Sequence, residues 1–191
     1  MLRGRADLAA EPFVAGWAEC GRPLVACRPP HGAPSAMIAA GLALPPQFGK
    51  KRLSVLLPPE AIIQIAPPPS LAEAAIDAPE PWRDTLDILI AVEPEAAVFG
   101  GLAWQHGTGL RYLADTSDVD LLFPHRSRVE SLILLERVAA IADAAPMRLD
   151  GELIRDDGGA VQWRELFDGA SEVLVKRMDG VGPMARTAFL S

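Results

Sequence analysis

Composition alone excludes several kinds of protein, because this chain of 191 residues contains only two cysteines, three histidines and one tyrosine. Two cysteines are too few for a disulfide scaffold, and the spacing of Cys20 and Cys27 matches no common zinc site. We therefore expect two unpaired thiols in a protein of a reducing compartment.

Long apolar runs and excess positive charge are also missing. No uninterrupted run approaches the roughly 20 apolar residues that a membrane helix needs, and the N-terminus lacks the regions of a signal peptide. These absences predict a cytoplasmic protein without membrane attachment. The formal net charge of −7 argues against a general nucleic-acid binder, which usually carries a basic face.

Proline is plentiful, with 18 residues, and it divides the first third of the chain. Short apolar runs at 24–27, 41–44, 53–57 and 62–65 predict strands, because prolines bound them and stop ladders. Pro67, Pro68 and Pro69 are the most evident linker. We predict a small β-rich domain with its linker over 1–69 and a second domain over 70–191.

The second domain mixes helical and strand patterns. Ser70 with Glu73, and Ser127 with Glu130, have the spacing of capping boxes and predict helix starts. Helices are predicted over 82–92 and 125–144, and strands over 147–155, 161–167 and 172–176, followed by a short tail. The expected fold class is α+β, with helices packed on a mixed sheet.

The most informative stretch, residues 98–122, reads VFGGLAWQHGTGLRYLADTSDVDLL. On a strand, residues i and i+2 point to the same side, so Asp118 and Asp120 would project together while Val119 faces the core. Paired carboxylates suit Mg²⁺, which prefers hard oxygen ligands and substrate phosphates. The alternative is an ordinary pair of exposed aspartates at the start of a strand.

Gly100 and Gly101 precede these acids by one short helix. They follow a strand-like AAVF run and open a helix-like LAWQ run. Glycines at such a turn allow backbone N–H groups to approach a phosphate closely, helped by the helix dipole. The alternative is an ordinary strand-to-helix turn, but the two features together favour a site for metal and phosphate.

This combination resembles the DNA polymerase beta-like nucleotidyltransferase superfamily. The string from Phe99 to Leu122 is similar to one branch, the malonate decarboxylase holo-acyl-carrier-protein synthases, or phosphoribosyl-dephospho-CoA transferases (MdcG family). The segments LPPQFGKKRLSVLLPP, RLDGELIRDDGGAVQWREL and EVLVKRMDGV extend the resemblance over most of the chain. The chain departs from the superfamily at Gly101, where serine is frequent, and this removes one hydroxyl contact to phosphate.

The resemblance implies a third carboxylate on the strand over 147–155, where Arg148, Asp150 and Glu152 share one face. Asp150 is the favoured third carboxylate, and Glu152 stays open as the alternative. The third carboxylate would bind the metal and accept the proton of the attacking hydroxyl. Lys176 is a candidate phosphate contact or an ordinary surface lysine. His106 and Arg126 are weaker candidates for binding phosphate, and an ordinary role without phosphate contact is favoured for both.

The resemblance also implies the reaction. A phosphoribosyl-dephospho-CoA group would move from 2′-(5″-triphosphoribosyl)-3′-dephospho-CoA to a serine of the apo acyl-carrier subunit of malonate decarboxylase, releasing pyrophosphate. Lys50, Lys51 and Arg52 form a candidate basic surface for an acidic carrier. Two alternatives remain: a Mg²⁺-dependent nucleotidyltransferase that uses ATP, and a carrier-binding scaffold whose site has decayed.

Overall fold

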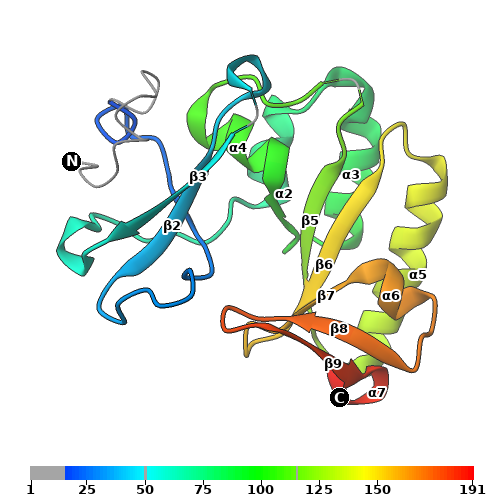
Figure 1. Cartoon of the computed structure of the whole chain (residues 1–191). Coiled ribbons are helices and arrows are strands. Elements are labelled where there is room, and N and C mark those ends of the chain that lie inside the picture. The colour runs from blue at the N-terminus through cyan, green and yellow to red at the C-terminus, as the bar shows by residue number, and fades with distance from the viewer. Residues whose placement is uncertain (1–15, 50, 115) are drawn as a thin grey trace. The chain divides into compact units, whose positions relative to one another are not determined.

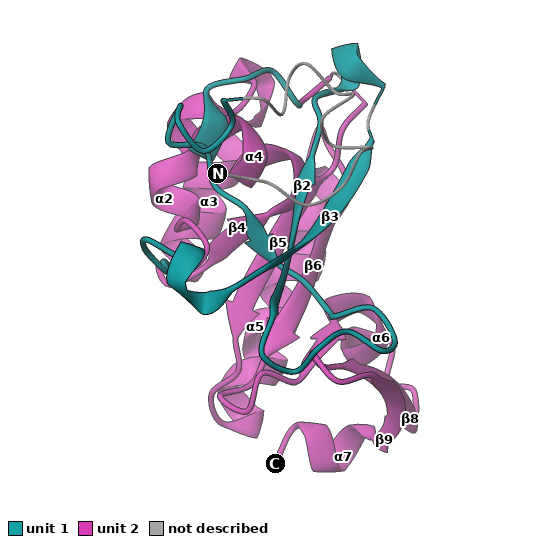
Figure 2. Ribbon diagram, turned by 60° about the vertical axis from the view of Figure 1, so that its left-hand side comes forward, with its two compact units in different colours: residues 1–67, 107–112 teal, residues 68–106, 113–191 magenta. Residues whose placement is uncertain are grey.

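The computed structural model describes residues 16–49, 51–114 and 116–191, which form two compact units. Unit 1 contains the described part of 1–67 together with 107–112, and unit 2 contains 68–106 and the described part of 113–191 (Figure 2). A small antiparallel sheet in unit 1 and a mixed sheet with helices in unit 2 confirm the predicted α+β class.

Unit 1 is built on a three-stranded antiparallel sheet, β1 (Val25–Ala26), β2 (Ile38–Ala43) and β3 (Arg52–Leu57). Leu42, Leu44 and Val55 are buried in it. The Tyr112 hydroxyl donates to the carbonyl of Ala43 over 2.7 Å, and burial raises the pKa of Tyr112 to about 12. Two short 3-10 turns, η1 (Pro46–Phe48) and η2 (Pro59–Ala61), each begin at the second residue of a proline pair.

Unit 2 contains a six-stranded sheet whose strands follow their order in the chain. The parallel pair of β5 and β6 lies among antiparallel neighbours. Its strands are β4 (Ala97–Phe99), β5 (Val119–Pro124), β6 (Leu149–Ile154), β7 (Ala160–Gln162), β8 (Glu172–Lys176) and β9 (Val181–Ala185).

Helices pack on this sheet and enclose its core (Figure 1). The helices are α2 (Leu71–Ala74), α3 (Arg83–Val92), α4 (Gly100–Thr108), α5 (Arg128–Ala144), α6 (Trp163–Phe167) and α7 (Arg186–Phe189), with 3-10 turns η3 (Ala75–Asp77) and η4 (Glu80–Trp82). Leu86 and Leu89 of α3 and Leu134 and Val138 of α5 are buried with the strands. No helix in the described ranges is long and apolar enough to cross a membrane.

Both predicted capping boxes are confirmed. The side chain of Ser70 accepts from the backbone N–H of Glu73, and the Glu73 carboxylate accepts from Ser70 in return. Ser127 and Glu130 make the same reciprocal bonds at the start of α5. Each box satisfies two N–H groups that have no partner inside the helix.

The strand predicted over 62–65 was wrong. The residues between η2 and the proline run form no strand, and Ile63 and Ile65 are exposed. A β-branched run becomes a strand only where a neighbour pairs with it, and in the described chain β3 pairs with β2 alone.

The end of the chain also differs from the prediction. The strand expected over 161–167 ends at Gln162, where the Gln162 side chain accepts from the backbone N–H of Arg164 and begins α6. The expected tail forms β9, which pairs with β8, and then α7. Phe189 is fully buried, so these last residues contribute to the core.

One ion pair, between a buried carboxylate and an exposed guanidinium, joins the ends of β4 and β5 that lie away from the glycine turn. Glu93 precedes β4 and is 3% exposed, and both of its carboxylate oxygens accept from the guanidinium of Arg126, which follows β5. These bonds hold the pKa of Glu93 below its ordinary value and raise the pKa of Arg126. Arg126 also lies 3.1 Å from Glu95, so its role is structural here.

We expect Arg126→Ala to lower the free energy of unfolding by about 2 kcal/mol at neutral pH, because it leaves a buried carboxylate without its donor. Glu93 has a lowered pKa in the native protein, so its stabilisation is present above its ordinary pKa and is lost as the pH falls. The difference between variant and parent should therefore shrink in acid.

Urea unfolding from about pH 7 to about pH 3, which extends below the ordinary pKa of a glutamate, measures this difference. Arg128→Ala removes an equal charge from an exposed residue two positions along and serves as the matched control. Equal effects of the two substitutions at neutral pH would contradict a stabilising role for the Glu93–Arg126 ion pair.

Candidate metal centre

The site begins with the pairing of three neighbouring strands. In the antiparallel pair, Phe99 of β4 lies opposite Asp120 of β5, and in the parallel pair Asp120 lies beside Asp150 of β6. The burial of β5 and β6 alternates along both strands, with Val119, Leu121 and Leu149 facing the core. Asp120 and Asp150 consequently project together on the opposite face.

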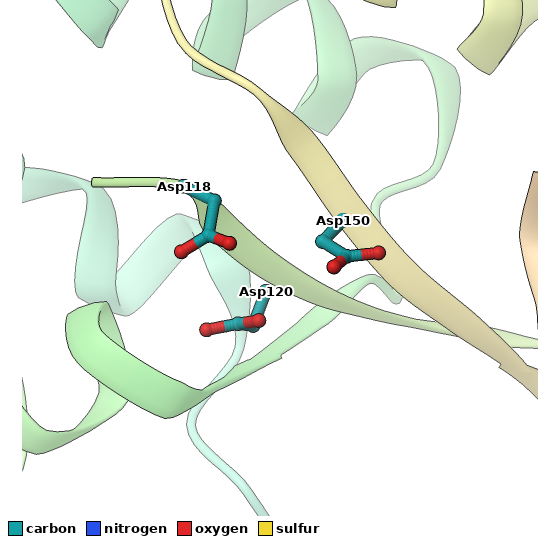
Figure 3. Close-up of side chains that lie close together, drawn as sticks. All are labelled: Asp118, Asp120 and Asp150. Atoms are coloured by element: carbon teal, nitrogen blue, oxygen red, sulfur yellow. The ribbon is translucent and has the colours of Figure 1, made fainter. Parts of the chain in front are cut away.

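Asp118, immediately before β5, joins them in a cluster of three carboxylates (Figure 3). One oxygen from each of these side chains lies within 4.8 Å of one from each of the others. All three aspartates are half-buried, so substrate and solvent can reach them. The sequence separation of Asp150 from the other two is bridged by α5, which returns the chain to the same end of the sheet.

Gly100 lies directly against this cluster. It has a φ of +60°, and a Cβ at this position would lie 1.8 Å from the Oδ2 atom of Asp120. Two features therefore disfavour any side chain at this position: the left-handed backbone conformation and the nearby carboxylate of Asp120. The predicted strand, glycine turn and helix are all present as β4, Gly100 and α4.

Gly101 is fitted to a different neighbour. A Cβ at position 101 would lie 2.8 Å from the Cδ2 atom of Leu113, which is 5% exposed. The backbone N–H of Leu113 donates to Oε1 of Gln105 in α4 over 3.1 Å, which ties this residue to the helix. The side chain of Leu113 thus occupies the space next to Gly101, and a serine at position 101 would require that leucine to shift.

Asp150 and Glu152, the two candidates for the third acid, have different surroundings. Oδ1 of Asp150 accepts from the side-chain amide of Gln162 over 2.8 Å and from the backbone N–H of Gly151 over 3.1 Å. Glu152 lies outside the cluster and forms an ion pair with Lys176 of β8. Among the described residues, the metal-compatible group therefore contains Asp150 and omits Glu152.

Two further candidates have structural partners. Nδ1 of His106 lies 2.7 Å from a carboxylate oxygen of Asp77, and Arg126 binds Glu93. Sequence reasoning missed Gln162, because only the fold places it across from Glu152 and within reach of Asp150.

The donor set fits a hard divalent cation. The three carboxylates offer only oxygen ligands. Mg²⁺ and Ca²⁺ prefer oxygen ligands, whereas softer transition metals prefer sulfur or imidazole ligands. The exposed guanidinium of Arg148 lies 3.5 Å from Oδ2 of Asp150, at the edge of the group. Three carboxylates so close together repel one another, and a bound metal ion would relieve that repulsion.

Two family models match this chain. Residues 70–187 match the family model "Phosphoribosyl-dephospho-CoA transferase MdcG C-terminal domain", and residues 2–68 match the model of the MdcG N-terminal domain. The chain belongs to the MdcG family. The family resemblance seen in the sequence is thereby confirmed.

Curated relatives carry the same name. A phosphoribosyl-dephospho-CoA transferase of Bradyrhizobium diazoefficiens is 44% identical over 196 residues, spanning 100% of this chain and 86% of the relative. One from Xanthomonas campestris pv. campestris is 34% identical over 184 residues, spanning 94% of this chain and 86% of the relative. No solved structure matches the chain at a significant level.

The two MdcG models meet at the proline run, since one ends at residue 68 and the other begins at residue 70. The compact units change at the same run, between Pro67 and Pro68. All three aspartates and both glycines lie in the segment that matches the MdcG C-terminal domain.

We expect Gly100→Ala to disrupt the carboxylate cluster, because the added methyl group must displace Asp120. Binding of Mn²⁺, measured by electron paramagnetic resonance, should weaken at least about tenfold, and the free energy of unfolding should fall by about 1–3 kcal/mol.

Gly109→Ala is the matched control, since Gly109 has a similar φ of +66° but no atom within 4 Å of the position that the added methyl group would take. It should lose stability through backbone strain alone and keep its affinity for Mn²⁺. Equal metal affinities in the two variants would show that the cluster does not depend on Gly100.

Proposed function

We propose that this chain transfers the phosphoribosyl-dephospho-CoA group from 2′-(5″-triphosphoribosyl)-3′-dephospho-CoA to a serine of the apo acyl-carrier subunit of malonate decarboxylase. The observation that carries the proposal is the cluster of Asp118, Asp120 and Asp150 in a member of the MdcG family. The family supplies the transferase activity, and the cluster supplies a centre at which phosphoryl chemistry can occur.

In this proposal the metal is Mg²⁺, and Asp118, Asp120 and Asp150 hold it. Bound Mg²⁺ supplies charge neutralisation for the leaving pyrophosphate and activation of the attacking hydroxyl. Support comes from the all-oxygen donor set and from an open face of half-buried side chains that a phosphate can reach.

Gly100 and Gly101 would bind the triphosphate through their backbone N–H groups. They open α4, which has nine residues, and the start of a helix favours negative charge. Lys176 would contact the donor's phosphates from β8, where its side chain is 49% exposed, and its ion pair with Glu152 keeps the ammonium group on the sheet. In this proposal Glu152 holds the ammonium group of Lys176 in position.

The transfer forms one bond and breaks another. The serine Oγ attacks the α-phosphorus, a phosphodiester forms, and the bond from that phosphorus to the pyrophosphate oxygen breaks. Asp150 is the candidate that accepts the hydroxyl proton, because Glu152 is occupied by Lys176. The smaller N-terminal domain, over 1–69, would help to bind the donor or the carrier.

The basic surface predicted for the carrier lies at the start of β3. Lys51 and Arg52 are exposed there, and Lys50 lies outside the described residues. We retain Lys51 and Arg52 as the candidate contact for an acidic carrier, because surface charges of opposite sign speed association.

The decisive experiment is the intact mass of the apo carrier subunit after incubation with this protein, Mg²⁺ and the triphosphoribosyl donor. We expect the carrier to gain one phosphoribosyl-dephospho-CoA group. Asp118→Asn should slow the transfer by at least about 100-fold, since it removes a metal-binding charge. A chelator should abolish it.

Asp143→Asn, which neutralises an exposed aspartate at the end of α5, is the matched control and should react at the parent rate. Modification with ATP alone would replace this proposal with a general nucleotidyltransferase. Carrier binding without modification, unaffected by Asp118→Asn, would favour a decayed scaffold. Modification of a different carrier would overturn the choice of acceptor and leave the reaction intact.

We also expect Lys176→Gln to raise the KM for the donor about tenfold and to change kcat less than about threefold, because a phosphate contact made throughout the reaction contributes mainly to binding. Steady-state kinetics with varied donor measure both constants. Arg137→Gln, which removes an equal charge from an exposed position of α5, should leave the donor KM unchanged. An unchanged donor KM in Lys176→Gln would remove Lys176 from the binding site.

A further inference from the structure

The side chain of Gln162 joins the metal centre to the start of α6. Its Oε1 accepts from the backbone N–H of Arg164 over 2.6 Å, and its Nε2 donates to Oδ1 of Asp150 over 2.8 Å. The two bonds require opposite ends of the amide group, since a carbonyl accepts and an NH₂ donates. The orientation of the amide is therefore determined, and the end that faces Asp150 is the donor.

The backbone around Gln162 holds this side chain in place. Gln162 lies opposite Glu152 in the antiparallel pair of β7 and β6. The next two residues bind the carbonyl oxygen of Leu149, immediately before Asp150, through Nε1 of Trp163 at 3.4 Å and the guanidinium of Arg164 at 3.1 Å. That guanidinium also stacks on the Trp163 ring at 4.2 Å. The start of α6 is thus bound to β6 beside the metal centre.

The two oxygens of Asp150 consequently differ. Oδ1 receives two hydrogen bonds, one from Gln162 and one from the backbone N–H of Gly151. A carboxylate oxygen has two lone pairs, so both are directed at protein donors. Oδ2 lies 3.5 Å from Arg148, whose side chain is 65% exposed and can move away when a cation arrives.

We propose that Gln162 is a positioning residue that binds Oδ1 of Asp150 and thereby presents Oδ2 to the metal ion. This inference rests on the proposed function, because it assumes that the three aspartates bind a divalent cation. Hydrogen-bonding partners of metal-binding carboxylates restrict their rotation, and their removal costs about 10- to 100-fold in metal affinity or activity.

Gln162→Ser separates this role from the capping of α6. Serine is a good N-cap residue, so the helix keeps an acceptor for its first N–H groups, but its side chain is too short to reach Asp150. We expect the affinity for Mn²⁺, measured by electron paramagnetic resonance without donor or carrier, to fall about tenfold. The Mg²⁺ concentration that gives half-maximal transfer should rise by a similar factor, and the midpoint of urea unfolding should change little.

Two comparisons complete the test. Gln64→Ser makes the same substitution at an exposed position of unit 1 and should bind Mn²⁺ as the parent does. In an Asp150→Ala background, Gln162→Ser should have no further effect, since the side chain that Gln162 binds is already lost.

The outcomes distinguish the two proposals. Parent protein that binds Mn²⁺, together with a Gln162→Ser variant of equal affinity, overturns the positioning role and leaves the metal centre in place. An additive loss in the double variant also overturns it, because Gln162 would then act through something other than Asp150. Absence of Mn²⁺ binding in the parent overturns both proposals.

Discussion

The parallel pairing of β5 with β6 is the constraint on which the rest of the site depends. It places Asp120 beside Asp150, two residues that are 30 positions apart in the chain. Parallel neighbours need a long crossover connection, usually a helix, and α5 supplies it. The side chains of Leu134, Leu135 and Val138 bury this helix against the same strands, so the core packing also determines the register.

Packing on one face of the sheet offsets the energetic cost of the cluster on the other face. The aspartates repel one another when no cation is bound, and that repulsion opposes folding. Val119, Leu121 and Leu149 belong to the same two strands and are fully buried, each contributing about 1.5–3 kcal/mol. Alternation along the strand therefore lets a single segment supply both the core and the acidic site.

Local signals predicted local features. Ser127 and Glu130 are close in sequence, so the start of α5 followed directly from their spacing, and the two faces around Val119 followed from the period of a strand. Predictions that needed a partner elsewhere were less secure. The apolar run at 62–65 lacks a strand to pair with, and the residues after Lys176 find one in β8. Neither outcome is encoded in the segment itself.

The choice between Asp150 and Glu152 illustrates the same limit at the site. Both acids lie on one face of β6, so strand periodicity cannot separate them. Their neighbours on the adjacent strands distinguish them. Lys176 of β8 forms an ion pair with Glu152, whereas Gln162 of β7 donates a hydrogen bond to one oxygen of Asp150.

A neutral amide and a cation have opposite consequences for a neighbouring carboxylate. The ammonium of Lys176 compensates the charge of Glu152 and makes that acid a poor ligand for a second cation. The amide of Gln162 carries no charge, and the exposed Arg148 near Oδ2 can move away, so Asp150 would keep its attraction for a metal ion. In the proposed metal centre, the third carboxylate would therefore be selected by the side chains of β7 and β8, two strands that contribute no acid to the group of three aspartates.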